Sequence, residues 1–317
     1  MALAFQTFRR KPMVLLLLLP VPVISVILQA INLQFLPDLS KLLDVNYLLE
    51  NSARMETTQQ MMITNMVSML VSSLSLILSL CFVVLLVPAT MELLADGAAG
   101  VETAPGWFTR GLRRHWWKPI TDSAITDGIF IVLFIPLYIV FIVVGVAVSG
   151  VAAGAAGSMG GMPVPDTADG IMSSILAPIL LMALIFAVIV FVLRLLVYSV
   201  FGLFLPAMAD RGFGQAFRLM FSKKGFRKLP RMLGGQALIL LLPGLVYVVL
   251  FAAYLLISGL PVDAQGYLIG ILNFMKSWAG ILGLLLVSIM GILIYPFRFA
   301  VYQLVRDEEA AAEQTQQ

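Results

Sequence analysis

Residues Met62–Val87 read MITNMVSMLVSSLSLILSLCFVVLLV, an apolar run that contains no Asp, Glu, Lys or Arg. A helix that crosses a hydrocarbon layer of roughly 30 Å needs about 20 mainly apolar residues. Such runs must form helices, because a single segment in lipid has to satisfy its own backbone hydrogen bonds. Other stretches of this kind are Met13–Leu33, Ile125–Val151, Ile171–Phe204, Ala237–Leu260 and Tyr267–Ala300. The sequence therefore predicts an all-α polytopic transmembrane bundle with about six spans.

The composition supports a membrane location and argues against several classes of site. Hydrophobic residues make up 61% of the 317 residues and charged residues only 12%, whereas soluble domains average about 25% charged residues. The lone cysteine, Cys81, excludes an intrachain disulfide and a cysteine-based metal centre. The glycine-rich stretch 145–161 lacks the patterns of nucleotide-binding loops, so no cofactor is expected. Nucleic acid is not an expected partner, because the basic residues are dispersed among membrane-proximal segments.

The basic residues gather in alternate connecting segments. Sixteen Lys and Arg residues lie before span 1, between spans 2 and 3, between spans 4 and 5, and after span 6. The other loops hold only Lys41, Arg54 and Lys276. Cytoplasmic loops of membrane proteins carry an excess of Lys and Arg. The sequence therefore predicts that both termini lie in the cytoplasm.

Three basic segments resemble one another. AFQTFRRKP (residues 4–12), WFTRGLRRHWWKP (107–119) and QAFRLMFSKKGFRKLP (215–230) are aromatic and basic, and each ends on proline before a span. Proline fits the first turn of a helix, where its missing N–H is not needed. The even-numbered spans are also similar, because they exit through Pro88, Pro206 and Pro296.

These similarities predict three hairpin units within one membrane domain over residues 1–306. The units cover about 1–100, 101–210 and 211–306, and the acidic and polar tail 307–317 is expected to be disordered. The alternative interpretation is that proline, aromatic and basic residues are simply common at membrane boundaries.

The basic segments are predicted to form amphipathic helices. Phe213, Phe217, Met220 and Phe221 share one helical face, as do Phe108, Leu112 and Trp116. Such helices lie in the plane of the lipid headgroups, where their cations contact anionic lipid and anchor the protein to the membrane surface. The alternative roles are docking of a partner protein and selective binding of one lipid headgroup. The candidate lipid or partner contacts are Trp107, Arg110, Arg113, Arg114, Trp116, Trp117, Lys118, Phe217, Arg218, Lys223, Lys224, Arg227 and Lys228.

Two features form a candidate intramembrane polar site. Arg194 is the one charge inside the run Ile171–Phe204, and an intramembrane charge often marks a functional site. Its alternative role is structural, because the long side chain can extend to the cytoplasmic surface beside Tyr198. Span 2 carries a polar seam whose members are Asn65, Ser68, Ser72, Ser75 and Ser79. The seam is typical of close helix packing, and a polar path for a substrate is the alternative.

Residues 206–219, PAMADRGFGQAFRL, lead into Phe226-Arg227-Lys228 and resemble a pattern in a loose group of uncharacterised bacterial six-span inner-membrane proteins. That group is similar to the membrane domain of some glycerophosphoryl diester phosphodiesterases. In the pattern, glycine follows a span and an Ala-Phe-Arg helix leads into the next hairpin; Gly106–Pro119 matches it more weakly. The resemblance implies a bacterial inner-membrane location. It implies no enzymatic activity, because this sequence lacks the soluble phosphodiesterase barrel with its metal-binding residues.

The leading hypothesis is a non-enzymatic membrane protein that organises lipid or an unidentified partner protein through its cytoplasmic basic-aromatic helices. Anionic headgroups on the cytoplasmic face are the expected lipid partners. The alternative is a small transporter or lipid flippase with a path near Arg194 and the span 2 serine seam. An intramembrane enzyme ranks third, because no nucleophile–base set, intramembrane acid pair or HExxH motif is found.

Overall fold

The computed structural model of the chain describes residues 2–35, 55–158, 168–259 and 264–316. Within these ranges the regular structure is entirely helical, and six helical runs are long and apolar enough to cross a membrane. The all-α, polytopic fold predicted from the sequence is therefore confirmed.

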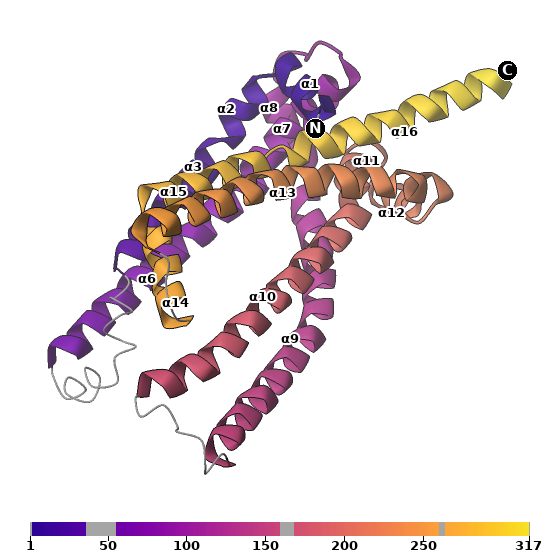
Figure 1. Cartoon of the computed structure of the whole chain (residues 1–317). Coiled ribbons are helices and arrows are strands. Elements are labelled where there is room, and N and C mark those ends of the chain that lie inside the picture. Colours follow the sequence, from indigo (N-terminus) through magenta and orange to yellow (C-terminus); the bar gives the residue numbers. More distant parts are fainter. Residues whose placement is uncertain (1, 36–54, 159–167, 260–263, 317) are drawn as a thin grey trace.

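The spans follow one another along the chain with short helices between them (Figure 1). Span 1 consists of α2 (Met13–Leu18) and α3 (Pro20–Phe35). Span 2 consists of α6 (Met55–Cys81), a π-helical turn (Phe82–Leu86) and α7 (Val87–Ala99). Span 3 is the single helix α9 (Lys118–Ser158). Span 4 consists of α10 (Ala168–Val200), a 3-10 turn (Phe201–Leu203) and α11 (Phe204–Arg211). Span 5 is the single helix α13 (Lys223–Ser258). Span 6 consists of α15 (Trp278–Gly291) and α16 (Ile294–Gln316). The short helices are α1 (Ala2–Arg10), α8 (Trp107–His115), α12 (Phe213–Met220) and α14 (Ala264–Lys276).

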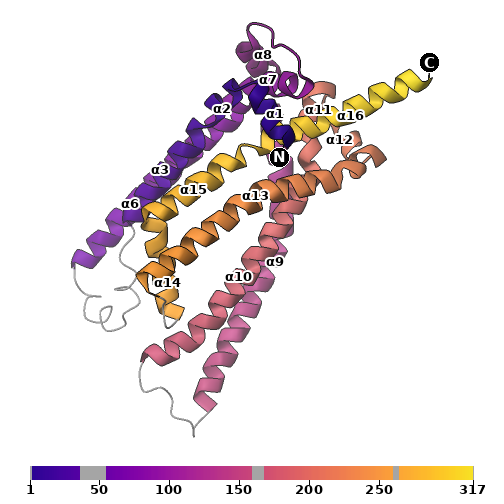
Figure 2. The ribbon, with the colours of Figure 1, turned by 45° about the horizontal axis from the view of Figure 1, so that its top comes forward.

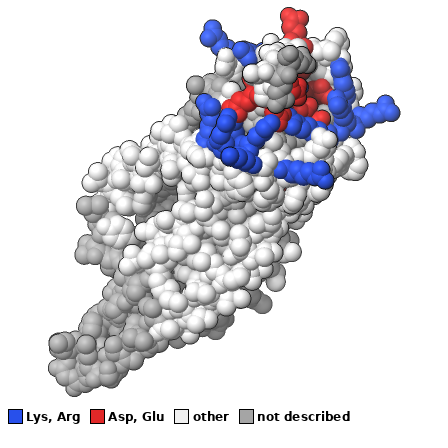
Figure 3. All heavy atoms as spheres, turned by 90° about the vertical axis from the view of Figure 1, so that its right-hand side faces the viewer, with Lys and Arg blue, Asp and Glu red and all other residues white. Residues whose placement is uncertain are grey.

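Consecutive spans pack as helical hairpins. Helix α3 contacts α6, α9 contacts α10, and α13 contacts α15, and Figure 2 shows these pairs running side by side. Lys, Arg, Asp and Glu gather at one end of the molecule, whereas the described residues on the rest of the face in Figure 3 show no charged side chain. We call this region the charged end; it carries α1, α8, α11, α12 and most of α16 (Figure 1).

Each even-numbered span has an irregular turn just before its proline. The π-helical turn precedes Pro88, the 3-10 turn precedes Pro206, and α15 and α16 are separated at Ile292–Leu293 before Pro296. Proline cannot donate to the carbonyl four residues earlier, so the regular helix is interrupted at these positions. We call α7, α11 and α16, which follow the three turns, the exit helices.

Each exit helix packs against a short basic helix. Helix α7 contacts α8, α11 contacts α12, and α16 contacts α1, so the last unit of the chain joins the first. The contact of α8 with α7 is close: a Cβ at Gly111 would lie 2.8 Å from the carbonyl oxygens of both Pro88 and Ala89. The three-unit repeat itself remains a prediction from the sequence.

The buried core lies at the charged end, where the exit helices contact one another. Its largest fully buried side chains include Phe204, Met91 and Met208. Farther along the spans, large side chains such as Leu184 and Val248 are more than half exposed, as expected for helices that face lipid. The charged side chains therefore lie on a packed core.

Three details differ from the sequence predictions. Helix α13 runs through Pro230, so this proline lies inside a helix instead of in its first turn. The stretch predicted as span 6 is divided at Ser277, whose extended backbone and side-chain bond to the Gly280 N–H cap a new helix, α15. The tail predicted to be disordered continues α16 to Gln316, because Glu308 and Glu309 form ion pairs with basic residues of α11 and α13.

Candidate functional site at the charged end

A buried ion pair joins spans 3 and 6 beneath the charged end. Arg298 donates from Nη1 and Nη2 to the two carboxylate oxygens of Asp122 at 2.9 and 2.8 Å, and both side chains are less than one tenth exposed. The same guanidinium donates to the carbonyls of Gly202, at 2.7 Å, and Phe201, at 3.0 Å. Because Pro206 cannot donate to the Gly202 carbonyl, Arg298 supplies the missing donor.

A second set of buried polar contacts joins spans 3, 4 and 5. The Ser199 hydroxyl donates to Gln236 at 3.2 Å, and the Gln236 amide donates to the Tyr198 carbonyl at 3.3 Å. The Tyr198 hydroxyl in turn donates to Asp127. These contacts and the Asp122–Arg298 pair form a polar layer that fixes the relative positions of the spans.

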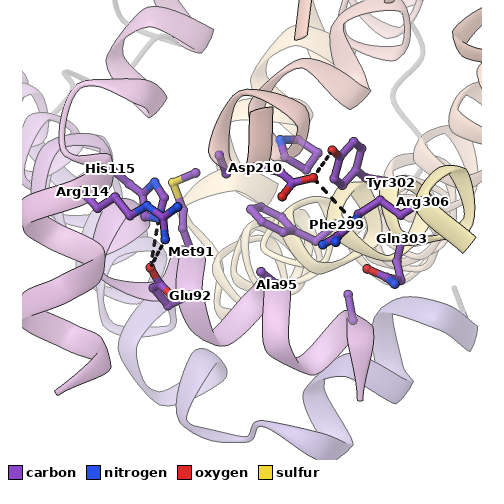
Figure 4. Close-up of a pocket in the computed structure, with 13 residues that line it drawn as sticks. Met91, Glu92, Ala95, Arg114, His115, Asp210, Phe299, Tyr302, Gln303 and Arg306 are labelled. Carbon is purple, nitrogen blue, oxygen red and sulfur yellow. Dashed lines mark hydrogen bonds and ion pairs between the residues drawn. The ribbon is translucent and has the colours of Figure 1, made fainter. Parts of the chain in front are cut away.

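A cavity of about 120 Å³ lies above this layer, where the three exit helices meet α8. Figure 4 shows side chains from all four helices converging on it. We call it the central cavity. Besides Pro206 and Tyr302, the exit helices contribute nine residues that lie three, four, seven or ten positions after their prolines. Those residues are Met91, Glu92, Ala95 and Ala98 on α7, Ala209 and Asp210 on α11, and Phe299, Gln303 and Arg306 on α16.

Two charged clusters stand at the central cavity (Figure 4). Glu92 lies 3.7 Å from Arg114 and 3.3 Å from the His115 ring. Asp210 accepts a hydrogen bond from the Tyr302 hydroxyl at 2.7 Å and lies 3.6 Å from Arg306. The cavity therefore offers both signs of charge above a floor of apolar side chains.

His115 is a buried, neutral ring between a cation and a carboxylate. Its Nδ1 lies 2.8 Å from the Lys118 ammonium, which can only donate, so Nδ1 accepts and Nε2 carries the proton toward Glu92. Burial, and then the charges of Lys118 and Arg114, lower the pKa of His115 from 6.5 to about 3. The nearby Glu92 carboxylate favours the opposite direction, but burial and two cations outweigh it.

This pKa predicts a stability loss in mild acid. Between pH 6.5 and about 3 the unfolded chain binds a proton at His115 that the folded protein excludes, so the free energy of unfolding falls as the pH decreases. Thermal unfolding is measured in detergent between pH 7.5 and 5. As the pH decreases, the Tm of the wild type should fall more steeply than the Tm of the His115→Gln variant. The variant keeps Glu92, Lys118 and Arg114, so a difference in slope between the two proteins reports on His115. Equal slopes would contradict the assignment of a neutral His115.

The structure places most predicted lipid contacts on the outside of the charged end. Helix α8 exposes its three arginines and Trp116, whereas Trp107 and Trp117 are half-buried and Lys118 is buried. Helix α12 exposes Phe213, Phe217 and Phe221, whose rings contact one another in sequence.

One detail of the predicted α12 face is wrong. Met220 packs into the core with Ala216 and Leu219, so the exposed phenylalanines form a second, outward face. Arg218 and Lys223, which are close to these phenylalanines in the sequence, are also exposed. A short helix with apolar groups on two faces is typical of one that packs on its own protein and on another apolar phase.

The remaining predicted cations contact the acidic tail. Glu308 pairs with Lys228 and, at 2.6 Å, with Arg227. Glu309 pairs with Arg211 and, at 3.3 Å, with Lys224. Lys224, Arg227 and Lys228 are therefore not freely available to an external anion while the tail is in place.

The candidate intramembrane residues lie on separate hairpins. Arg194 on α10 is exposed, with its guanidinium 5.3 Å from the centre of the Tyr198 ring. In the seam on α6, Ser68 donates to the Asn32 side chain of α3 at 2.9 Å, and Ser75 is half-buried. Asn65, Ser72 and Ser79 are exposed. A substrate path through these residues stays a prediction.

Sequence reasoning did not find the central cavity. The sequence signal that could have pointed to it is an acidic residue four positions after two of the exit prolines, Glu92 after Pro88 and Asp210 after Pro206. Comparison with known proteins adds no family to this description: no protein-family model, curated protein or solved structure matches the chain.

Proposed function

We propose that this multi-span membrane protein binds anionic lipid through α8 and α12 and thereby organises lipid around its charged end. A non-enzymatic role in a bacterial inner membrane, with both termini in the cytoplasm, completes the proposal. The resemblance and the distribution of basic residues described above support this location.

The observation that carries the proposal is that exposed aromatic rings and exposed cations occur together at α8 and α12. Phe217 and Phe221 are 43% and 51% exposed, which is unfavourable in water but favourable at the acyl boundary of a membrane. Arg113, Arg218 and Lys223 form no ion pair within the described part of the chain. Anionic phosphates at the same level of the membrane supply the partners that these cations lack.

A charge-reversal experiment tests the proposal. Arg113→Glu, Arg218→Glu and Lys223→Glu are combined in one variant, and its affinity for phosphatidylglycerol is compared with its affinity for phosphatidylcholine. Quenching of tryptophan fluorescence by brominated lipids reports on both, because Trp116 is exposed at this end. Since each cation near an anionic surface contributes about 1 kcal/mol, the preference for the anionic lipid should fall at least tenfold.

The matched control keeps every charge through Arg113→Lys, Arg218→Lys and Lys223→Arg. It should retain the wild-type preference at low ionic strength and lose it as salt is added. An unchanged preference in the charge-reversal variant would show that α8 and α12 do not select anionic lipid.

A further inference from the structure

We propose that the central cavity binds a small zwitterion, a molecule with an ammonium group at one end and a phosphate or carboxylate at the other. This inference goes beyond the proposed function, which concerns exposed cations on the outside of α8 and α12. It rests on side chains that line a partly open space among α7, α8, α11 and α16 (Figure 4).

Two guanidinium groups at the cavity have unused donors. Arg114 and Arg306 lie 3.7 and 3.6 Å from their carboxylate neighbours, which is too long for an N–H···O hydrogen bond. Within the described part of the chain, neither side chain donates a hydrogen bond. A guanidinium presents a planar fork of donors that matches the two oxygens of a phosphate or carboxylate. Both side chains are more than half exposed, so an oxyanion at the cavity can replace water at these donors.

Two carboxylates at the same cavity have unused acceptors. His115 and Arg114 both approach Oε1 of Glu92, and the Tyr302, Arg211 and Arg306 contacts all fall on Oδ2 of Asp210. The other oxygen of each carboxylate accepts no hydrogen bond from the described residues. An ammonium group has three donors and suits such oxygens. The cavity can thus satisfy a cation and an anion together.

The charge balance favours a ligand without net charge. Arg114 and Arg306 oppose Glu92 and Asp210, and the His115 ring is neutral, so the charges that line the cavity cancel. A simple anion would be repelled by two carboxylates and a simple cation by two guanidinium groups. A zwitterion places each of its groups against the opposite charge.

The volume and the floor of the cavity limit the ligand to a small molecule. A volume of about 120 Å³ is close to the roughly 150 Å³ of a protein cavity that holds one benzene molecule. Met91, Pro206 and Phe299 provide apolar surface between the two charged clusters. A short carbon linker between the two charged groups fits that surface, as in phosphoethanolamine or a small amino acid. The same chemistry occurs free in the cytoplasm and in the headgroup of phosphatidylethanolamine.

The first arm of the test uses soluble ligands and the full chain in detergent. Isothermal titration with phosphoethanolamine should give binding at least about tenfold tighter than titration with ethanolamine or inorganic phosphate, each of which satisfies one half of the site. Arg306→Gln should weaken this binding about tenfold to a hundredfold, because a charge-assisted pair is lost. Arg231→Gln is the control, since Arg231 on α13 is an exposed arginine that neither lines the cavity nor belongs to the cations of the proposed lipid site.

The second arm tests the lipid source. The protein is reconstituted in mixed phosphatidylethanolamine and phosphatidylglycerol and then extracted. The retained lipid is quantified by mass spectrometry for the wild type, Arg306→Gln and Arg231→Gln. Selective retention of phosphatidylethanolamine that only Arg306→Gln abolishes assigns the site to a headgroup. Binding in the first arm alone assigns it to a soluble zwitterion.

The proposal is overturned if neither arm shows binding that depends on Arg306, or if ethanolamine or phosphate alone binds as tightly as phosphoethanolamine. An unchanged Tm of the ligand-free Arg306→Gln variant verifies that its fold is intact. The anionic-lipid preference measured with Arg113, Arg218 and Lys223 is independent of this result, so failure of one proposal leaves the other standing.

Discussion

Replacing Arg298 with methionine is expected to lower the free energy of unfolding by about 3–5 kcal/mol, because it leaves the buried Asp122 carboxylate without its partner. The substitution also removes the donors to the Gly202 and Phe201 carbonyls at the 3-10 turn of span 4. Thermal or denaturant unfolding of the detergent-solubilised protein measures the loss. Arg298→Lys should be intermediate, since an ammonium keeps the charge but cannot bond both carboxylate oxygens and two carbonyls in this geometry.

Two further variants distinguish loss of the Asp122–Arg298 ion pair from the effect of removing any positive charge. Arg306→Met removes an arginine from the same helix whose side chain is half exposed and whose ion pair is loose, so the loss should stay below about 1 kcal/mol. Asp122→Leu combined with Arg298→Met removes both buried charges and should recover part of the stability. If Arg298→Met proves as stable as Arg306→Met, the buried pair does not hold spans 3 and 6 together.

The spans could be predicted because each one is determined by the apolar residues of its own segment. A run such as Met62–Val87 decides its own state in lipid, whatever the rest of the chain does. The prolines Pro88, Pro206 and Pro296 are equally local, and each coincides with an irregular turn. Both features depend on backbone hydrogen bonds within a few residues, and these are readable from one segment.

The contents of the charged end were not predictable, because they depend on distant partners. Asp122 and Arg298 are separated by 176 residues, and either one alone reads as an ordinary charge at a membrane boundary. The same holds for His115 and Glu92, which meet only because Gly111 lets α8 approach α7. Met220 illustrates the limit of helical periodicity, since α12 has two apolar faces and the spacing does not say which of them is buried.

Removing the acidic groups of the tail is expected to strengthen the preference for anionic lipid about thirtyfold. Glu308 and Glu309 contact four cations of α11 and α13, namely Arg211, Lys224, Arg227 and Lys228. In Glu308→Gln combined with Glu309→Gln, the local charge rises by two units, and each unit near an anionic surface contributes about 1 kcal/mol. Quenching by brominated phosphatidylglycerol relative to phosphatidylcholine measures the change.

The control is Asp307→Asn combined with Glu313→Gln, which changes the net charge of the tail equally but touches none of the four cations. It should leave the lipid preference close to that of the wild type, since neither of these carboxylates pairs with any of the four cations. Equal effects of the two double variants would mean that the tail acts only through its overall charge. A specific effect of Glu308 and Glu309 would mean that α16 competes with lipid for the basic residues at the start of α13, and that lipid binding and tail position are thermodynamically linked.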